Sequence, residues 1–221
     1  MYSLPLKSLK ACLRNYKETS HAKLFFQVFN RLAMLVNDEF KNEIKKAFHS
    51  SFEEAFVAGS DTSRWQFKEK STLENLDTKE FYVLTMSSQL FRIFIFLHFS
   101  KNDDTEKFVS SVLNLTSAKL DEDKFYDYLG EVGNAFLGSI KRDLGKHIPS
   151  LGMSTPNRLS IDCLKYMKNL NSNFESHAIS TFDDKVLFYS SVYLVADEEL
   201  NIHIDRHSLE NEVDSGELEL F

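Results

Sequence analysis

One segment, Lys124–Ile148 ("KFYDYLGEVGNAFLGSIKRDLGKHI"), contains the strongest candidates for a functional site. Asp127, Glu131, Asn134 and Gly138 follow one another at spacings of four, three and four. Residues at these spacings share one face of a helix. The carboxylates can pair with cations, and the amide can both donate and accept hydrogen bonds. A helix that aligns these groups could therefore bind a polar partner or act on one.

An apolar stripe lies on the other side of the same helix. At 3.6 residues per turn, five side chains fall within an arc of about 80°: Phe125, Leu129, Val132, Phe136 and Ile140. This stripe must face the core, so the polar set faces either solvent alone or a partner. Gly133 and Gly138 each cost roughly 1 kcal/mol relative to Ala inside a helix. A bare helix surface at Gly138 would let another protein's backbone come close.

The chain before this helix begins with helical patterns. Apolar residues recur at helical spacing from His21 to Phe56, and the pattern breaks at Asn37–Glu39, where a capping Asn precedes acidic residues. We therefore expect an N-terminal helical extension over residues 1–37, whose apolar stripe covers this domain or a second subunit. A second helix should end at Ala58–Ser63.

The remaining segments predict strands and two more helices around the polar-faced helix. In order, these are a strand at Trp65–Lys70, a hairpin at Glu80–Ser100 turning near Ser87–Gln89, a helix over Lys101–Leu115 capped by Asp103 or Asp104, the polar-faced helix at about Asp121–Leu144, a loop at Gly145–Ser160, and a hairpin over 176–204 around Asp183 and Asp184. This order predicts an α+β fold with long helices on one face of a mainly antiparallel sheet. No repeat longer than a helical turn is visible by eye.

Length and composition predict a globular protein. The chain has 221 residues, of which 43% are hydrophobic and 20 are Phe, so it can bury a substantial core. The most apolar run, Phe91–Phe99, is roughly half of the ~20 residues that a membrane helix needs, so no span is predicted. The first residues lack an uninterrupted apolar stretch, so no secretory signal is expected and the protein is placed in the cytosol.

The distribution of charge and the positions of Cys and His argue against nucleic-acid binding and against a metal site. Nine acidic residues fall in Asp197–Phe221 against Arg206 alone, and the rest of the chain is about neutral. No basic stripe suits nucleic acid. Cys12 and Cys163 are far apart and read as ordinary thiols. His203 and His207 are four apart, but the local pattern is typical of a strand, which would separate them, so no metal site is expected.

The polar-faced helix carries a family resemblance. "YDYLGEVGNAFLGSIKRDLGKHI" followed by "STPN" resembles the CheC/CheX-type phosphatases of bacterial chemotaxis, and its glycines and "LGKH" look like the CheX branch. The signature of that family is Asp or Ser, three residues, Glu, two residues, Asn, and a Pro some twenty residues later. Asp127, Glu131, Asn134 and Pro156 occupy those places. The likeness extends over about Phe40–Asp205.

The resemblance implies a substrate and a role for each residue. The substrate would be the aspartyl phosphate of a CheY-like response regulator, with Asn134 orienting the attacking water and Glu131 pairing with the regulator's active-site Lys. Asp127, Gly138 and Pro156 would bind the partner. The regulator's own acidic pocket would bring Mg²⁺, so this chain would need no metal or cofactor.

An alternative is a non-catalytic module that docks a regulator or a flagellar or chemotaxis component through the same helix. Asn134 separates the two hypotheses, because docking alone does not need an amide there whereas water positioning does. A second string, Glu39 with Asn42, lacks both the acidic or Ser residue four places before Glu, where Leu35 stands, and the later Pro. We interpret it as ordinary helix.

The resemblance also predicts domain bounds and assembly. We expect an extension over 1–37, a CheX-like domain over 38–205 and an acidic tail over 206–221. CheX-type proteins form homodimers through their sheets, and the resemblance implies the same for this chain. The apolar run Val186–Val195 would be hazardous as an exposed edge strand, so we expect it to be paired or covered in a homodimer.

Overall fold

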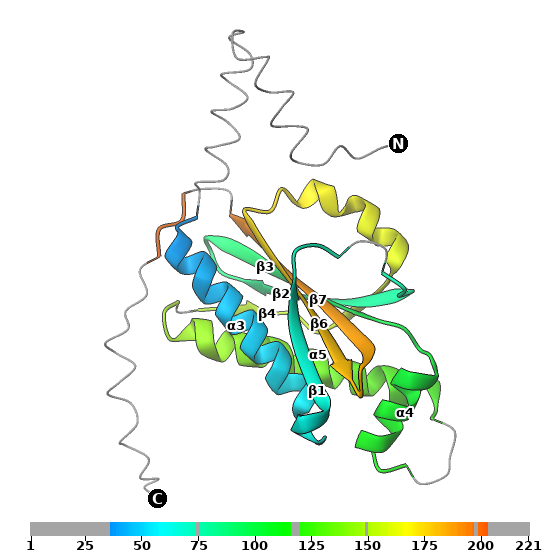
Figure 1. The fold of residues 1–221 in the computed structure, drawn as a ribbon. Helices are drawn as coiled ribbons and strands as arrows, with labels where there is room; N and C mark the ends of the chain where they lie inside the picture. The colour runs from blue at the N-terminus through cyan, green and yellow to red at the C-terminus, as the bar shows by residue number, and fades with distance from the viewer. Residues whose placement is uncertain (1–35, 74–75, 116–119, 149, 197–198, 203–221) are drawn as a thin grey trace, which may run out of the picture.

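Seven strands form one antiparallel sheet, and two long helices cover one of its faces (Figure 1). The computed structural model describes residues 36–73, 76–115, 120–148, 150–196 and 199–202. Most of the predicted N-terminal extension and the whole acidic tail lie outside the described residues. The predicted α+β class, with helices on one face of an antiparallel sheet, is confirmed.

The strand order of the sheet is β1-β6-β7-β3-β2-β4, and β5 also pairs with β2. The strands are β1 (Trp65–Lys70), β2 (Glu80–Ser87), β3 (Phe91–Phe99), β4 (Gly152–Met153), β5 (Asn157–Ser160), β6 (Phe174–Phe182) and β7 (Lys185–Ala196). The order is symmetric about the central β7–β3 pair. The hairpin partners β6 and β2 flank that pair, and β1 and β5 pair with β6 and β2 from outside.

Helix α3 (Asp38–Val57) packs over β1, β6 and β7, and helix α5 (Glu122–Gly145) packs over β2. The two helices also contact each other. Helix α4 (Asp103–Val112) packs against α5 and β7. Two 3-10 segments, η1 (Thr62–Arg64) and η2 (Ile161–Leu170), complete the described elements.

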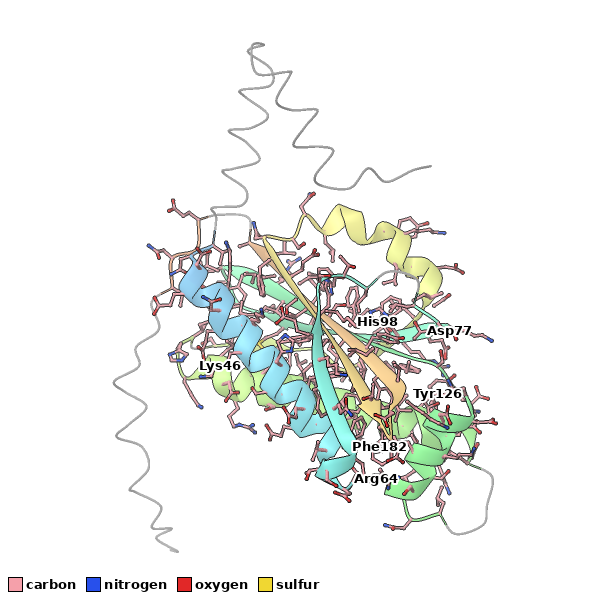
Figure 2. The ribbon with its side chains drawn as sticks, in the orientation of Figure 1. Lys46, Arg64, Asp77, His98, Tyr126 and Phe182 are labelled. Atoms are coloured by element: carbon pink, nitrogen blue, oxygen red, sulfur yellow. The ribbon has the colours of Figure 1, made fainter. Side chains whose placement is uncertain are left out.

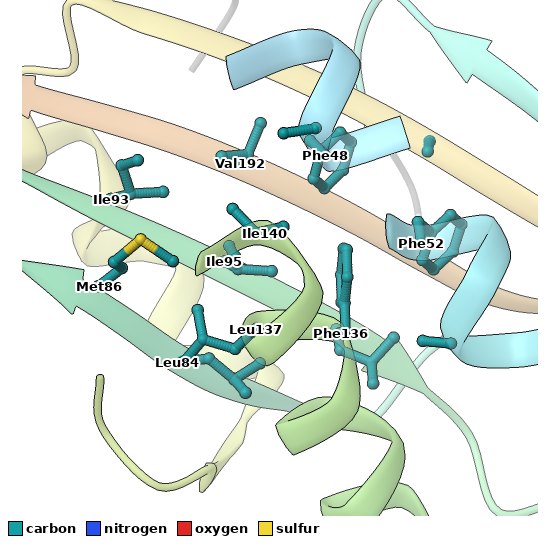
Figure 3. Packing of buried hydrophobic residues seen from close by; sticks show 14 of the residues in the cluster. Phe48, Phe52, Leu84, Met86, Ile93, Ile95, Phe136, Leu137, Ile140 and Val192 are labelled. Carbon is teal, nitrogen blue, oxygen red and sulfur yellow. The ribbon is translucent and has the colours of Figure 1, made fainter. Parts of the chain in front are cut away.

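Aromatic rings fill the space where α3 meets α5 (Figure 3). The ring of Phe136 lies 5.7 Å from that of Phe48 and 5.5 Å from that of Phe52, centroid to centroid, and all three side chains are fully buried. Phe136 belongs to the predicted apolar stripe, whose five members are all buried. Burying this stripe is the main force that turns the polar face of α5 outward.

The sequence pattern located α5, β1 and the central hairpin within one or two residues. The strand at Trp65–Lys70 is β1, and the central hairpin turns at Ser88–Leu90 between β2 and β3. The last hairpin turns at Asp183 and Asp184, whose φ angles of 50° and 61° suit a two-residue turn between antiparallel strands. Trp65 is buried, as expected of a core residue.

Two local predictions were wrong. The cap of α4 is Asn102, not Asp103 or Asp104. Its side-chain oxygen accepts hydrogen bonds from the backbone N–H groups of Asp104 and Thr105, and the Thr105 hydroxyl accepts one from the backbone N–H of Asn102, which completes a capping box. The predicted loop at Gly145–Ser160 contains β4 and β5, which pair with β2. Strands this short carry almost no periodic signal, so only the partner strand reveals them.

The argument for a dimer from an exposed edge was also wrong. The run Val186–Val195 lies in β7, which pairs with β3 on one side and β6 on the other, so it is a central strand. The homodimer itself stays a prediction. Asn37 begins α3 as predicted, but its side-chain nitrogen donates to the carbonyl of Ile202 (2.8 Å) instead of capping the helix.

We expect acid to destabilise the fold through His98. This side chain is 2% exposed, on the sheet face opposite the long helices, with its ring 5.2 Å from that of Phe81. Burial, and secondarily the charge of His177, lowers the pKa of His98 to about 3. In the unfolded chain His98 has an ordinary pKa near 6.5, so it binds a proton at a higher pH there than in the folded protein. Stability should be complete above pH 6.5 and fall as the pH drops from there toward 3.

At pH 5 this loss amounts to about 2 kcal/mol from His98 alone. Urea unfolding at pH 7.5 and pH 5 measures it, in the parent and in His98→Leu. The variant should lose distinctly less stability between the two pH values. An equal loss in both proteins would show that other groups cause the acid sensitivity.

Candidate functional site

The candidate site lies on the outward face of α5. Asp121 caps the helix and acidic residues fill its first turn, which suits the positive end of the helix dipole. Asp127, Glu131 and Asn134 are all exposed, and Gly138 is half-buried. The predicted outward face is therefore confirmed, and the helix brings the carboxylates and the amide together on one surface.

Pro156 lies against the same helix at Gly133. A Cβ atom on Gly133 would lie 3.5 Å from Cγ of Pro156 and 3.3 Å from Cδ2 of Leu84. The segment before Pro156 is fixed to β2, since Thr85 and Ser154 exchange two hydrogen bonds of 2.9 Å. The distant proline is thus held beside α5, next to the residue that precedes Asn134. Sequence reasoning counted Gly133 only as a cost to the helix and missed this close approach.

The surroundings of Gly138 differ from those of Gly133. A Cβ atom there, or on Gly130, would meet nothing within 4 Å, so no contact inside the described chain explains either glycine. The helix surface at these positions is bare and accessible. This is the surface that a partner's backbone could approach closely.

We expect Gly138→Ala to raise the free energy of unfolding by about 1 kcal/mol, because Ala favours helix and finds open space. Gly133→Ala is the matched control and should gain less, since its Cβ presses on Leu84. Urea unfolding of the two variants measures both changes. Equal stabilisation by the two substitutions would mean that the Leu84 side chain moves aside without cost.

A cation lies near the N-terminal half of α5. The guanidinium of Arg158 is 3.8 Å from the ring centroid of Tyr126, and its Nε is 3.9 Å from a carboxylate oxygen of Glu80. The Tyr126 hydroxyl donates to Glu80 (2.6 Å), and the Tyr82 hydroxyl donates to the Tyr126 carbonyl (3.0 Å). Burial, followed by the bond to Glu80, raises the pKa of Tyr126 to about 12. Tyr126 therefore stays neutral and holds β2 and β5 beside the site.

Nothing in the sequence pattern marked Arg158 as part of this border. Its position depends on β5, which pairs Tyr82 with Arg158 across the strands.

The other border of the site is formed by α3. There Ser51 donates to Ser139 (3.0 Å), Ser139 donates to Glu54 (2.7 Å), and Arg142 pairs with the same carboxylate (2.8 Å).

The site has the chemistry of a docking surface with one amide in it. Its polar groups are exposed, and within the described ranges no three His, Cys, Asp or Glu side chains are grouped to hold a metal ion. None of the described helices is long and apolar enough to cross a membrane. The surface offers Glu131 for a cation and Asn134 for hydrogen bonds in both directions.

Comparison of the sequence with profiles of known protein families and with curated proteins finds no match. Solved structures share the fold. A chain of the CheX–CheY–BeF3–Mg complex from Borrelia burgdorferi has a TM-score of 0.51 and 11% identity over 69% of this chain and 96% of its own. CheX from Vibrio vulnificus has a TM-score of 0.51 and 13% identity over 70% of this chain and 98% of its own.

A CheC-like chemotactic protein from Shewanella oneidensis has a TM-score of 0.50 and 16% identity, over 67% of this chain and 98% of its own. The three matches span nearly the whole of each solved chain and about two thirds of this one. The predicted resemblance is therefore confirmed at the level of the fold.

Proposed function

We propose that this chain, which has the CheC/CheX fold, hydrolyses the aspartyl phosphate of a CheY-like response regulator. The observation that carries the proposal is that α5 exposes Glu131 and Asn134 together, with Pro156 packed beside them on Gly133. The CheX–CheY complex among the structures of this fold supports the class of partner.

Asn134 would act on the water. In this reaction the bond between the phosphorus and the aspartyl oxygen breaks, a bond from phosphorus to the water oxygen forms, and carboxylate and inorganic phosphate leave. Such transition states ask the protein mainly for positioning and charge stabilisation. The amide oxygen of Asn134 can accept a hydrogen bond from the water, and its NH₂ group can donate to a phosphoryl oxygen. No other amide shares this face of α5.

Glu131 would act on the partner protein. Two anions repel each other in a partly dry interface, so its carboxylate would not face the phosphoryl group. It would pair with the active-site Lys of the regulator. Asp127, Gly138 and Pro156 would contact the partner around this pair, and the regulator's acidic pocket would hold the Mg²⁺. A partner of this kind also places the protein in the cytosol.

The test is phosphate release from the phosphorylated cognate regulator with and without the full-length protein. We expect the protein to accelerate release at substoichiometric concentration, which shows turnover. Binding without acceleration would favour the non-catalytic docking module. A dimer would appear in the same preparation as a mass of twice 25.6 kDa by light scattering.

A further inference from the structure

Strand β1 leaves one edge of the sheet open. It is the last strand in the sheet order and, among the described residues, it pairs only with β6. Its beginning is fixed by Arg64, whose guanidinium lies over the ring of Phe182 (4.2 Å to the centroid) and donates to Asp183 (2.9 Å). Figure 2 shows Arg64 and Phe182 next to each other at this end of the strand. The outer N–H and C=O groups of β1 are therefore held in a regular row that can pair with a further strand.

The two faces of β1 carry different side chains. Phe67 lies on the face that the long helices cover, with its ring 5.6 Å from that of Phe52, and it is only half-buried. Side chains alternate along a strand, so Lys68 and Lys70 lie on the opposite face. Both are exposed, and neither ammonium group has a hydrogen bond or ion pair with a described residue. The open edge thus offers cations on one face and a partly covered aromatic ring on the other.

A segment of the acidic tail has the complementary pattern. Residues 217–221 read "ELELF", in which acidic and apolar side chains alternate. In a strand, Glu217 and Glu219 would share one face, and Leu218 and Leu220 would share the other. The segment lies outside the described residues, so its sequence is the evidence for how it can bind. A strand with these two faces matches both faces of the β1 edge.

The tail begins close enough to reach this edge. Asn37, at the start of α3, donates from its side chain to the carbonyl of Ile202 (2.8 Å). Lys45 lies eight residues further along α3, or about 12 Å, and its ammonium pairs with Glu69 of β1 (2.7 Å). The 14 residues at 203–216 can span up to about 46 Å when extended. The tail can therefore approach β1 from the C-terminal end of that strand and run antiparallel to it.

Pairing with β1 would combine three interactions. Main-chain hydrogen bonds add a strand to the open edge. In an antiparallel register, Glu219 would face Lys68 and Glu217 would face Lys70, which are favourable cross-strand pairs. The same register places Leu220 beside Phe67. A strand of five residues binds weakly by itself, but its connection to the domain makes the binding intramolecular, at an effective concentration in the millimolar range.

The other edge of the sheet fits this segment less well. It is formed by β4 and β5, which have two and four residues and are interrupted between Met153 and Asn157. Their one cation is Arg158, which is already engaged by Tyr126 and Glu80. Strand β1 is longer, is continuous, and carries two cations without a described partner.

We propose that residues 217–221 add to the open edge of β1 of the same chain as an antiparallel strand, with Glu219 facing Lys68 and Glu217 facing Lys70. The pairing would cover an edge that is otherwise available to strands of other molecules. It uses no residue of the α5 site. The proposal therefore does not depend on the proposed function.

Amide hydrogen exchange of the full-length protein, followed by mass spectrometry, tests this pairing. The amides of residues 217–221 should be protected in the parent. Lys68→Glu combined with Lys70→Glu should speed their exchange by roughly tenfold, because two favourable cross-strand pairs become repulsive. Adding Glu217→Lys and Glu219→Lys to that variant should restore the protection.

Two matched controls separate a specific strand from a general attraction between charges. Lys107→Glu combined with Lys124→Glu changes the same charge at exposed positions of α4 and α5, and it should leave the tail protected. Glu210 and Glu212 lie in the same tail at the same spacing as the proposed pair. Replacing these two by Lys should not restore protection to the variant with Glu at positions 68 and 70.

The inference would be overturned if residues 217–221 exchanged without protection in the parent, or if their protection did not respond to Lys68→Glu with Lys70→Glu. Equal restoration by the Glu210 and Glu212 substitutions would also overturn it. Exchange is measured over a range of protein concentrations. Protection that rises with concentration would place the tail of a second copy on β1, and the pairing within one chain would then be wrong.

Discussion

Replacing Asn134 by Ala should slow the release of phosphate from the regulator by on the order of 100-fold, because the water loses the group that positions it. Asn134 is exposed on α5, and exposed substitutions usually change stability by no more than about 0.5 kcal/mol. The fold should therefore survive. Affinity for the regulator should change little, since the amide acts mainly in the transition state. Single-turnover release and calorimetry measure the two quantities separately.

Asn42→Ala is the matched control for this substitution. Asn42 is also an exposed helical Asn, on α3, and the sequence pattern marked it as ordinary helix. Its replacement should leave the rate of phosphate release unchanged. If Asn134→Ala released phosphate as fast as the parent, the catalytic proposal would fail and the docking module would replace it.

Replacing Glu131 by Ala should act mainly on affinity. The regulator's Lys would remain in the interface without its counter-ion, and truncating one member of such a pair costs about 2–5 kcal/mol, or at least about 30-fold in affinity. Release at saturating protein should fall much less, because the water is still positioned. Calorimetry and the concentration dependence of release measure this difference.

Glu53→Ala removes the same charge from an exposed helical position on α3 and serves as its control. That variant should bind and release phosphate like the parent. If Glu131→Ala kept full affinity and lost only rate, the carboxylate would have to act in the chemical step. The ion-pair assignment would then be wrong.

Much of the site could be predicted from spacing alone. The stripe of Phe125, Leu129, Val132, Phe136 and Ile140 specified which side of α5 is buried, and hence where Glu131 and Asn134 point. Helical spacing is a local property of 3.6 residues per turn, so it needs no knowledge of the partner elements. The strand at Trp65 and the strands around the two hairpin turns could be predicted because the alternation of residues along a strand is also a local property.

The surroundings of the site could not be read in this way. Pro156 reaches α5 only because β4 and β5 pair with β2, and Arg158 reaches Tyr126 through the same pairing. Two- and four-residue strands carry too little alternation to be found without their partner. The edge-strand argument for a dimer failed for a similar reason. The apolar pattern of β7 indicates that the strand is buried, but it does not show that β3 and β6 pair with its two edges.

Local sequence is enough to specify α5, its buried stripe and the outward position of its carboxylates and amide, because each depends on residues within a few turns of one another. The contact of Gly133 with Pro156, 23 positions away, and that of Arg158 with Tyr126 became visible only in the complete fold. Those features depend on pairings between residues far apart in the chain. Such pairings are selected by the packing of the whole core, which no local pattern specifies.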